Sequence, residues 1–401
     1  MIKTEYYKDL TKMNTFGMKV KARCFMEYDS VADLVDIEFE ELARPVLHIG
    51  GGSNLLFTDD FKGTVLHSKI NFIEILDDSP CHCEERVSCH SEERVSCHSE
   101  EPVSCHCEER VSCHCEERST PCHCEERSDV AIYVSVGAGV VFDDFCAWAA
   151  KEGLWGVENL SYIPGEVGAS AVQNIGAYGV EVKDVIHKVY CYDTVEEEFV
   201  NFSVEDCEYG YRDSIFKDPE IKGRYIVTHV VFALSREPRP RLDYGHLKEA
   251  VTSPENGDAS IERHLTPEMI RRVIIKIRKE KLPEPSVMGS AGSFFKNPVI
   301  TMEHYQRIEA AAKAEHGPDY KVPHYDLPDG MVKVPAAWMI EQCDWKGRRS
   351  GGAAVYDKQP LVIVNYTGEA YPEEIIGLER RIIASVKAKF GVDLHPEVEH
   401  I

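Results

Sequence analysis

Apolar residues recur three and four positions apart in three stretches of the chain, the spacing that buries one face of a helix. These stretches cover residues 141–154, 266–281 and 371–390. Their apolar positions are Phe142, Phe145, Cys146 and Ala149, then Ile270, Val273, Ile274 and Ile277, then Ile375, Leu378, Ile382, Val386 and Phe390. The pattern therefore predicts three amphipathic helices.

Residues that favour helix ends stand at the limits of these stretches. Thr266 can accept a hydrogen bond as N-cap of the second helix, and Pro267 suits its first position. Pro372 opens the third helix in the same way. Gly153 and Gly391 follow the first and third helices, where a left-handed residue ends a helix.

Runs rich in Val, Ile, Phe and Tyr predict strands at residues 185–194, 224–234 and 359–366. Residues 45–57 read as a strand, a glycine turn and a second short element. Strands and helices interleave without strict β-α-β alternation. We therefore expect an α+β fold made of several small sheets.

An eight-residue unit, typified by CHCEERVS, repeats six times between Cys81 and Asp129, with one extra proline. The 49 residues hold ten of the fifteen cysteines and a net charge of -8. No copy has enough large apolar side chains to offset the entropy lost on ordering. The repeat is therefore not expected to form a hydrophobic core of its own.

Two interpretations of this repeat are open. Thiol and imidazole groups are good zinc or copper(I) ligands, but the spacing is tighter than in known zinc motifs, and Ser91 and Ser99 replace two of the cysteines. Near-identical copies favour instead an inert insertion in a surface loop. Both flanking segments resemble strands, so we expect the insertion to extend a hairpin or another strand-to-strand loop, whose closure cost rises slowly with length.

The whole chain has 401 residues and a net charge of -24, of which the 352 residues outside the repeat carry -16. Such acidity argues against nucleic acid or an anionic membrane as partner. The N-terminus lacks a signal-peptide pattern and no apolar run is long enough to span a membrane. Five scattered cysteines outside the repeat suit a cytoplasmic enzyme.

Three glycine-rich segments indicate a nucleotide site. Residues 50–54 are Gly50, Gly51, Gly52, Ser53 and Asn54, whose backbone N–H groups can converge on a phosphate, although taken alone a plain tight turn fits them equally well. Gly139 closes the second segment, and the third, residues 161–179, is rich in small residues that let a backbone approach a flat cofactor. Together they favour a dinucleotide, although they do not distinguish NAD from FAD.

Three residues outside these segments are candidates for catalysis. Arg212 can clamp a carboxylate, although a structural pair with Asp213 is equally compatible with the pattern. Ser293 lies on a small-residue turn before two phenylalanines and can donate a proton; a plain turn serine is the alternative. Glu397 can act as an acid or electrostatic partner, or be an exposed carboxylate of the C-terminal tail.

Seven segments of the chain match one family in order. They read GGGSN, SYIPGEVGASAVQNIGAYG, YGYRDSIFK, LDYGHL, GSAGSFFKNP, GGAAV and HPEV. From residue 13 to Glu397, apart from the repeat, the chain closely resembles the UDP-N-acetylenolpyruvoylglucosamine reductase family.

The resemblance implies an α+β FAD-binding fold of the vanillyl-alcohol-oxidase (PCMH) type with a C-terminal substrate-binding α+β subdomain. Residues 1–70 with the tail 392–401 would form the first FAD-binding subdomain. Residues 71–280, including the repeat 81–129, would form the second, and residues 281–391 the substrate-binding subdomain.

The resemblance also implies a reaction. FAD would be bound non-covalently and reduced by NADPH, and the small-molecule substrate UDP-N-acetylglucosamine enolpyruvate would then take up hydride. Arg212 and Glu397 would stabilise charge on the substrate carboxylate, and Ser293 would donate the proton. The enzyme is expected to be a cytoplasmic monomer without a bound metal.

The resemblance assigns two further groups of residues. The substrate contacts would come from Tyr211, Tyr244, Lys281, Asn297 and Gln359. The FAD contacts would come from Gly50, Gly51, Gly52, Ser53, Asn54, Gly139, Ile163, Pro164, Gly165, Gly168, Ala169, Asn174, Gly176, Ala177 and Tyr178. Two other functions stay open: an FAD-dependent oxidase of a hydroxy acid or alcohol with the same fold, and a metal-binding protein built on the repeat.

Overall fold

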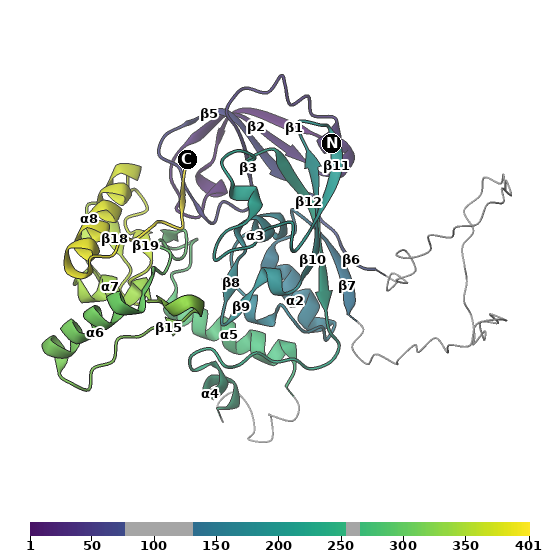
Figure 1. Ribbon diagram of the computed structural model, residues 1–401. Coiled ribbons are helices and arrows are strands. Elements are labelled where there is room, and N and C mark those ends of the chain that lie inside the picture. Colours follow the sequence, from purple (N-terminus) through teal and green to yellow (C-terminus); the bar gives the residue numbers. More distant parts are fainter. Residues whose placement is uncertain (77–130, 254–264) are drawn as a thin grey trace, which may run out of the picture.

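The structure is a computed structural model that describes residues 1–76, 131–253 and 265–401. Figure 1 shows three groups of elements: an N-terminal sheet (purple), a larger sheet with its helices (teal), and C-terminal elements (green to yellow) to one side. The repeat, residues 81–129, lies outside the described residues.

The N-terminal sheet has four strands in the order β1-β2-β5-β3. Its strands are β1 (Lys3–Asp9), β2 (Lys21–Tyr28), β3 (Val46–Ile49) and β5 (Phe61–Ser68). Strand β1 is antiparallel to β2, whereas β2 and β3 run parallel to β5. Helix α1 (Val31–Val35) lies between β2 and β3. The glycine loop 50–54 follows β3 directly, so it lies where the parallel strands end, a common place for a nucleotide.

The second sheet has five antiparallel strands in the order β11-β10-β12-β7-β6. They are β6 (Ile73–Ile75), β7 (Ile132–Gly137), β10 (Ile186–Asp193), β11 (Glu198–Ser203) and β12 (Tyr225–Leu234). Helices α2 (Phe142–Lys151) and α3 (Val167–Gln173) supply apolar residues to the same core. There, the ring of Phe145 from α2 lies 4.6 Å from that of Phe232 on β12, measured between centroids.

The repeat enters the chain between two paired strands. Ile73 and Ile75 of β6 lie opposite Val136 and Val134 of β7 in an antiparallel register. The expectation that the repeat extends a hairpin is therefore confirmed by the strands on either side of it. Strand β6 lies at the edge of the sheet and pairs only with β7. The repeat therefore does not separate any of the pairs β11-β10, β10-β12 and β12-β7.

The C-terminal elements form two small sheets and three helices. The sheets have the orders β13-β19-β18-β17 and β14-β16-β15. The strands are β13 (Gly289–Ser290), β14 (Val299–Thr301), β15 (Tyr325–Asp326), β16 (Met331–Lys333), β17 (Arg349–Ser350), β18 (Ala353–Val355) and β19 (Ile363–Asn365), and the helices are α6 (Met302–His316), α7 (Ala336–Gln342) and α8 (Pro372–Phe390). Buried residues of α7 and α8 share one core with Phe16 and Val65 of the N-terminal part.

The remaining elements are short or lie at the margins. They comprise β4 (Leu55–Leu56), β8 (Gly176–Ala177), β9 (Val180–Glu181), β20 (Glu399–His400), α4 (Leu247–Thr252) and α5 (Pro267–Lys281), with 3₁₀ turns at Thr11–Met13, Glu158–Leu160, Val182–Asp184, Ile215–Lys217 and Pro328–Gly330. Helix α5 contacts α2 and α4.

The C-terminal tail returns to the segment that follows the glycine loop. Strand β20 pairs in parallel with β4, and the carbonyl of Ile401 accepts hydrogen bonds from the N–H (2.8 Å) and Oγ1 (2.7 Å) of Thr58. Before that, the N–H of Glu397 donates to the carbonyl of Phe294 at 2.8 Å. The tail therefore joins the N-terminal and C-terminal groups of elements.

The three helices predicted from apolar periodicity are confirmed as α2, α5 and α8. The Thr266 hydroxyl caps α5 by accepting from the N–H of Met269, and Gly391 ends α8 with φ of 69°. The strand expected at residues 359–366 is shorter, because Val362 N–H bonds to the carbonyl of Gln359 in a turn and only Ile363–Asn365 pairs. The sequence patterns did not predict helices α1, α3, α4, α6 and α7; α3, for example, is rich in small residues that give little periodic signal.

The cysteines in the described part of the chain are free thiols, as their scattered positions predict. They are Cys24, Cys146, Cys191, Cys207 and Cys343. Burial raises the pKa of the Cys146 thiol well above its ordinary value. None of the described helices has the length and apolar character needed to cross a membrane.

A partly buried ion pair links α2 to α5. Arg271 donates two hydrogen bonds to Asp143, one of them at 2.9 Å to Oδ2, and the N–H of Tyr162 donates to the same carboxylate. Burial works against ionisation of Asp143, but these hydrogen bonds outweigh it and hold the pKa of the carboxyl below its ordinary value. The pair therefore stabilises the fold where Asp143 is ionised.

We expect Asp143→Asn to lower the free energy of unfolding by about 1–3 kcal/mol at pH 7, because charge-assisted hydrogen bonds are lost. A lowered pKa in the folded state gives stability that is present above about pH 4 and is lost as the pH falls through the folded-state pKa. The difference from the unsubstituted protein should thus shrink on acidification. Urea unfolding at neutral and acid pH measures it.

Asp144→Asn is the matched control, because Asp144 is the exposed neighbour on the same helix. It should change the free energy of unfolding by less than about 0.5 kcal/mol. The role given to Asp143 is contradicted if both variants lose the same free energy of unfolding. It is also contradicted if the difference between Asp143→Asn and the unsubstituted protein stays constant with pH.

Candidate active site

A cavity of ≈ 440 Å³ lies between the N-terminal and five-stranded sheets. The glycine loop 50–54 lines one side of it. Ala138, Gly168 and Ala169 line another, and Gln173 and Lys217 lie toward one end. The two sheets thus bring glycine segments that are more than a hundred positions apart in the sequence to one cavity.

The geometry of the glycine loop suits a bound anion. Gly52 has φ of 60°, and a Cβ atom there would lie 1.9 Å from the carbonyl oxygen of Met13. Gly51 approaches the backbone of Gly165, since its Cβ would lie 3.3 Å from the Cα of that residue. Within the described residues, the N–H groups of Gly51, Gly52 and Ser53 donate no hydrogen bond to protein. Unpaired N–H groups beside a cavity can hold a diphosphate.

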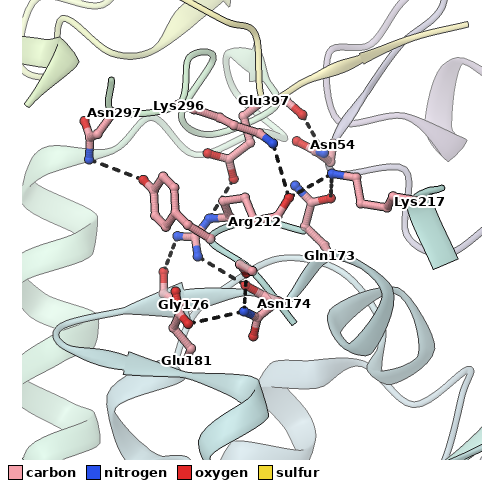
Figure 2. Close-up of polar contacts among 12 residues, drawn as sticks. Asn54, Gln173, Asn174, Gly176, Glu181, Arg212, Lys217, Lys296, Asn297 and Glu397 are labelled. Carbon is pink, nitrogen blue, oxygen red and sulfur yellow. Dashed lines mark hydrogen bonds and ion pairs between the residues drawn. The ribbon is translucent and has the colours of Figure 1, made fainter. Parts of the chain in front are cut away.

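A network of polar side chains lies next to this cavity. Arg212 Nε donates to Glu397 Oε1 at 2.9 Å, and the two side chains are only 16% and 13% exposed. Arg212 Nη1 and Nη2 donate to the carbonyls of Asn174 (3.2 Å) and Gly176 (2.6 Å), which come from the third glycine segment. Figure 2 shows the guanidinium between Glu397 and these two carbonyls. Three fixed acceptors therefore determine the orientation of Arg212.

The backbone of Arg212 is itself held by two lysines. Its φ of 55° is in the left-handed region, which is strained for a residue with a side chain. Lys217 Nζ donates to the Arg212 carbonyl at 3.0 Å and to Gln173 Oε1 at 3.0 Å. Lys296 Nζ donates to the same carbonyl at 3.4 Å. Two ammonium groups on one carbonyl thus stabilise the strained residue (Figure 2).

Glu397 reaches this network from the C-terminal tail. Its carbonyl accepts a hydrogen bond from Asn54 Nδ2 at 3.1 Å, which ties it to the glycine loop. Burial raises the pKa of the Glu397 carboxyl above its ordinary value, and the charges of Arg212 and Lys217 offset only part of the rise. This carboxyl is therefore easier to protonate than an exposed glutamate.

Comparison with known proteins gives the family. Residues 284–401 match the model of the UDP-N-acetylenolpyruvoylglucosamine reductase C-terminal domain, and residues 123–201 match an FAD binding domain. Proteins named UDP-N-acetylenolpyruvoylglucosamine reductase are 43% identical over 395 residues in Bacteroides fragilis and 40% over 394 residues in Neisseria meningitidis. These alignments cover 98% of this chain and 98% and 96% of the relatives.

This chain belongs to the UDP-N-acetylenolpyruvoylglucosamine reductase family. It is an FAD-containing oxidoreductase. The crystal structure of the reductase (MurB) from Thermus caldophilus has a TM-score of 0.57 at 20% identity, and the alignment covers 100% of this chain and 98% of that one. The expected α+β FAD-binding fold is therefore confirmed.

The reductase cavity fits FAD. The free N–H groups of the glycine loop suit a diphosphate, and Gln173 Nε2 is buried without a hydrogen-bond partner among the described residues. Of the expected FAD contacts, Gly50, Gly51, Gly52, Ser53, Asn54, Gly168 and Ala169 line the cavity. The described cavity wall does not include Gly139, Ile163, Pro164, Gly165, Asn174, Gly176, Ala177 or Tyr178.

Several of these other residues act beside the cavity. Pro164 accepts a hydrogen bond from Ser53 Oγ at 3.0 Å, so it joins the two glycine segments. Asn174 has φ of 46° and ends α3, and its Nδ2 donates to the carbonyl of Gly210 at 2.7 Å. Tyr178 packs edge-on against Tyr244. Their direct contact with FAD stays a prediction.

Ser293 is half-buried on a turn next to the tail. It follows Gly292, whose φ is 67°, and precedes Phe294, whose carbonyl accepts the N–H of Glu397. This hydrogen bond places the segments that contain Ser293 and Glu397 side by side, although the two residues are far apart in the sequence. The position is compatible with a proton donor beside the Arg212 network.

The structure brings together only some of the expected substrate contacts. Asn297 Nδ2 donates to the hydroxyl of Tyr211 at 3.3 Å, next to Arg212. The Tyr244 hydroxyl accepts a hydrogen bond from Tyr325 at 3.3 Å, and burial raises its pKa. Lys281 and Gln359 make no side-chain hydrogen bond with any other described residue. For these two the sequence-based role stays a prediction.

Sequence reasoning missed the two lysines that hold Arg212. Lys217 and Lys296 both lie inside motifs that match the family. A linear motif does not reveal that their ammonium groups converge on one carbonyl. In the part of the chain that the structure describes, no group of three or more His, Cys, Asp or Glu side chains could hold a metal ion.

We expect Gly52→Ala to abolish most FAD binding. The new Cβ would overlap the Met13 carbonyl, so the loop must move and its N–H groups can no longer converge. The ratio of flavin to protein absorbance after purification measures the loss. Gly153→Ala is the control: Gly153 also has positive φ (69°) but no atom lies within 4 Å of its Cβ position, so only strain of about 1–2 kcal/mol is added. Full flavin content in Gly52→Ala contradicts the assigned site.

Proposed function

We propose that this protein catalyses the NADPH-dependent, FAD-mediated reduction of UDP-N-acetylglucosamine enolpyruvate to UDP-N-acetylmuramate in peptidoglycan precursor synthesis. The observation that carries the proposal is the buried Arg212–Glu397 pair beside a cavity that fits FAD. Relatives that bear the reductase name at about 40% identity support the same reaction.

Arg212 is suited to bind the substrate carboxylate. A guanidinium has five N–H donors, and Arg212 uses three of them on Glu397, Asn174 and Gly176. One N–H remains on each of Nη1 and Nη2. These two donors remain for the substrate carboxylate, so the substrate can be bound without loss of the contacts that orient the side chain.

Glu397 would act on the same substrate carboxylate. Because its pKa is raised, the carboxyl can be protonated in the complex and donate a hydrogen bond instead of repelling the substrate charge. Hydride addition to the methylene carbon of the enol ether leaves negative charge on the neighbouring carbon and its carboxylate. Donors already fixed around that charge lower the barrier without reorganisation.

Ser293 would supply the proton that completes the reaction. The hydroxyl protonates the carbon next to the carboxylate, and the product is a lactyl ether. A serine has a high pKa, so it donates well only to a strongly basic carbanion at a site from which water is excluded. Phe294 and Phe295, which follow it, are almost fully buried and support such exclusion.

The cofactor and substrate would meet where the predicted subdomains meet. We propose subdomains at residues 1–70 with tail 392–401, 71–280 and 281–391, because each sheet of three or more strands lies within one of these ranges. Residues 50–54 would hold FAD, which supplies the hydride that it receives from NADPH. Tyr211, Tyr244, Lys281, Asn297 and Gln359 would contact the sugar nucleotide.

In anaerobic stopped-flow experiments, NADPH should bleach the visible flavin absorbance, and the enolpyruvyl sugar nucleotide should restore it. Ser293→Ala should keep the first step and slow the second by on the order of 10²–10⁴-fold, the usual contribution of a proton donor. Ser286→Ala, an exposed serine nearby, is the control. The reduced protein is also mixed with oxygen in a separate experiment. Flavin that is reoxidised rapidly by oxygen but not by the sugar nucleotide would favour an oxidase instead.

Arg212→Lys should lower kcat/KM for the sugar nucleotide by roughly 10²–10³-fold, because one ammonium group cannot replace the planar fork. The Kd for FAD and the rate of flavin reduction by NADPH should each stay within a few-fold of the values for the unsubstituted protein. Steady-state kinetics and flavin titration measure both. Arg236→Lys, an exposed position, should change neither. Near-normal turnover in Arg212→Lys rejects its role at the substrate carboxylate.

A further inference from the structure

A row of three ionisable side chains, two of them buried and Glu27 partly buried, lies beside the glycine loop. His67 of β5 is 2% exposed, and its Nδ1 lies 3.2 Å from Glu27 Oε2 while its Nε2 lies 3.0 Å from Glu166 Oε1. Glu27 belongs to β2, and Glu166 immediately precedes α3. The row therefore connects the N-terminal sheet to the segment that lines the cavity.

His67 contacts both carboxylates of the row. Its Nδ1 lies at hydrogen-bond distance from Glu27 and its Nε2 from Glu166. The imidazole therefore holds the Glu166 carboxylate in one orientation relative to β2 and β5.

One oxygen of Glu166 is left without a partner in the protein. Oε1 accepts from His67, whereas no described residue donates to Oε2. Glu166 lines the cavity, is 7% exposed, and its Oε2 lies 3.3 Å from the position of a Cβ on Gly50. Oε2 therefore stays available at the cavity wall, where a ligand group that donates a hydrogen bond can reach it.

The neighbouring loop limits what that donor can be. The free N–H groups of Gly51, Gly52 and Ser53 follow Gly50 and suit the diphosphate, which is anionic and cannot donate to Glu166. On either side of the diphosphate, FAD carries the hydroxyl groups of ribose and of the ribityl chain. Acidic residues next to glycine loops accept hydrogen bonds from such hydroxyls in other nucleotide sites.

We propose that Glu166 is a further FAD-binding residue whose Oε2 accepts a hydrogen bond from a sugar-chain hydroxyl next to the diphosphate. His67 is the positioning residue that orients the carboxylate. This proposal rests on FAD being the cofactor of the proposed function, but it does not depend on the identity of the substrate.

The test measures FAD affinity of apoprotein by quenching of flavin fluorescence, without substrate. Glu166→Ala should raise the Kd by roughly 10–100-fold, and Glu166→Gln, which keeps the shape but not the charge, by roughly 3–10-fold. Glu205→Gln, an exposed glutamate, is the control. If Glu166 faced a phosphate, Glu166→Gln would tighten binding. Tighter or unchanged binding in that variant overturns the proposal.

A double-mutant cycle separates positioning from general stability. His67→Gln should weaken FAD binding by several-fold in the original protein but add little to Glu166→Ala, because it acts through Glu166. Additive losses would show that His67 affects the fold and does not position Glu166. If the unsubstituted apoprotein fails to bind FAD, the proposed function is rejected. If it binds FAD and Glu166→Gln has the same Kd for FAD, only the role proposed for Glu166 is rejected.

Discussion

Glu397 reaches Arg212 because the last residues of the chain pair with the segment that follows the glycine loop. Strand β20 pairs with β4, and the terminal carbonyl is held by Thr58. Two residues before β20, the N–H of Glu397 donates a hydrogen bond to the carbonyl of Phe294, the residue after Ser293. A single length of extended backbone therefore sets the positions of two of the three expected catalytic residues relative to the glycine loop.

The charged groups of the Arg212 network are paired with one another and with backbone carbonyls. An unpaired buried guanidinium or carboxylate would cost several kcal/mol, whereas a pair with further hydrogen bonds loses much less. Arg212 has Glu397 and two carbonyls, and its own carbonyl has Lys217 and Lys296. The same network offsets the strain of the left-handed backbone at Arg212. Orientation and stability at the site therefore come from the same contacts.

The repeat shows how a large insertion can be tolerated in such a fold. Its ends join β6 and β7, which already form an antiparallel pair at the edge of a sheet. The entropy of closing a loop rises only with the logarithm of its length, so added residues change the free energy little once the hairpin exists. Arg212, Ser293 and Glu397 come from other segments, so their contacts do not depend on β6 or β7.

The sequence by itself determined the features that depend on neighbours in the chain. The Thr266 cap, the Gly391 stop and the apolar face of α8 act within one or two turns, so periodicity and end residues predict them. The long family motifs also identified the glycine segments and Arg212 without any coordinates.

Only the tertiary structure decided which of these groups meet. Arg212 and Glu397 are 185 positions apart, and His67 and Glu166 are 99 apart. Nothing local distinguishes His67 from other histidines, and Lys217 lies in a motif that does not show where its ammonium points. Such contacts arise when sheets from distant segments pack together, because side-chain direction and burial are set by the partner surface and not by the local sequence.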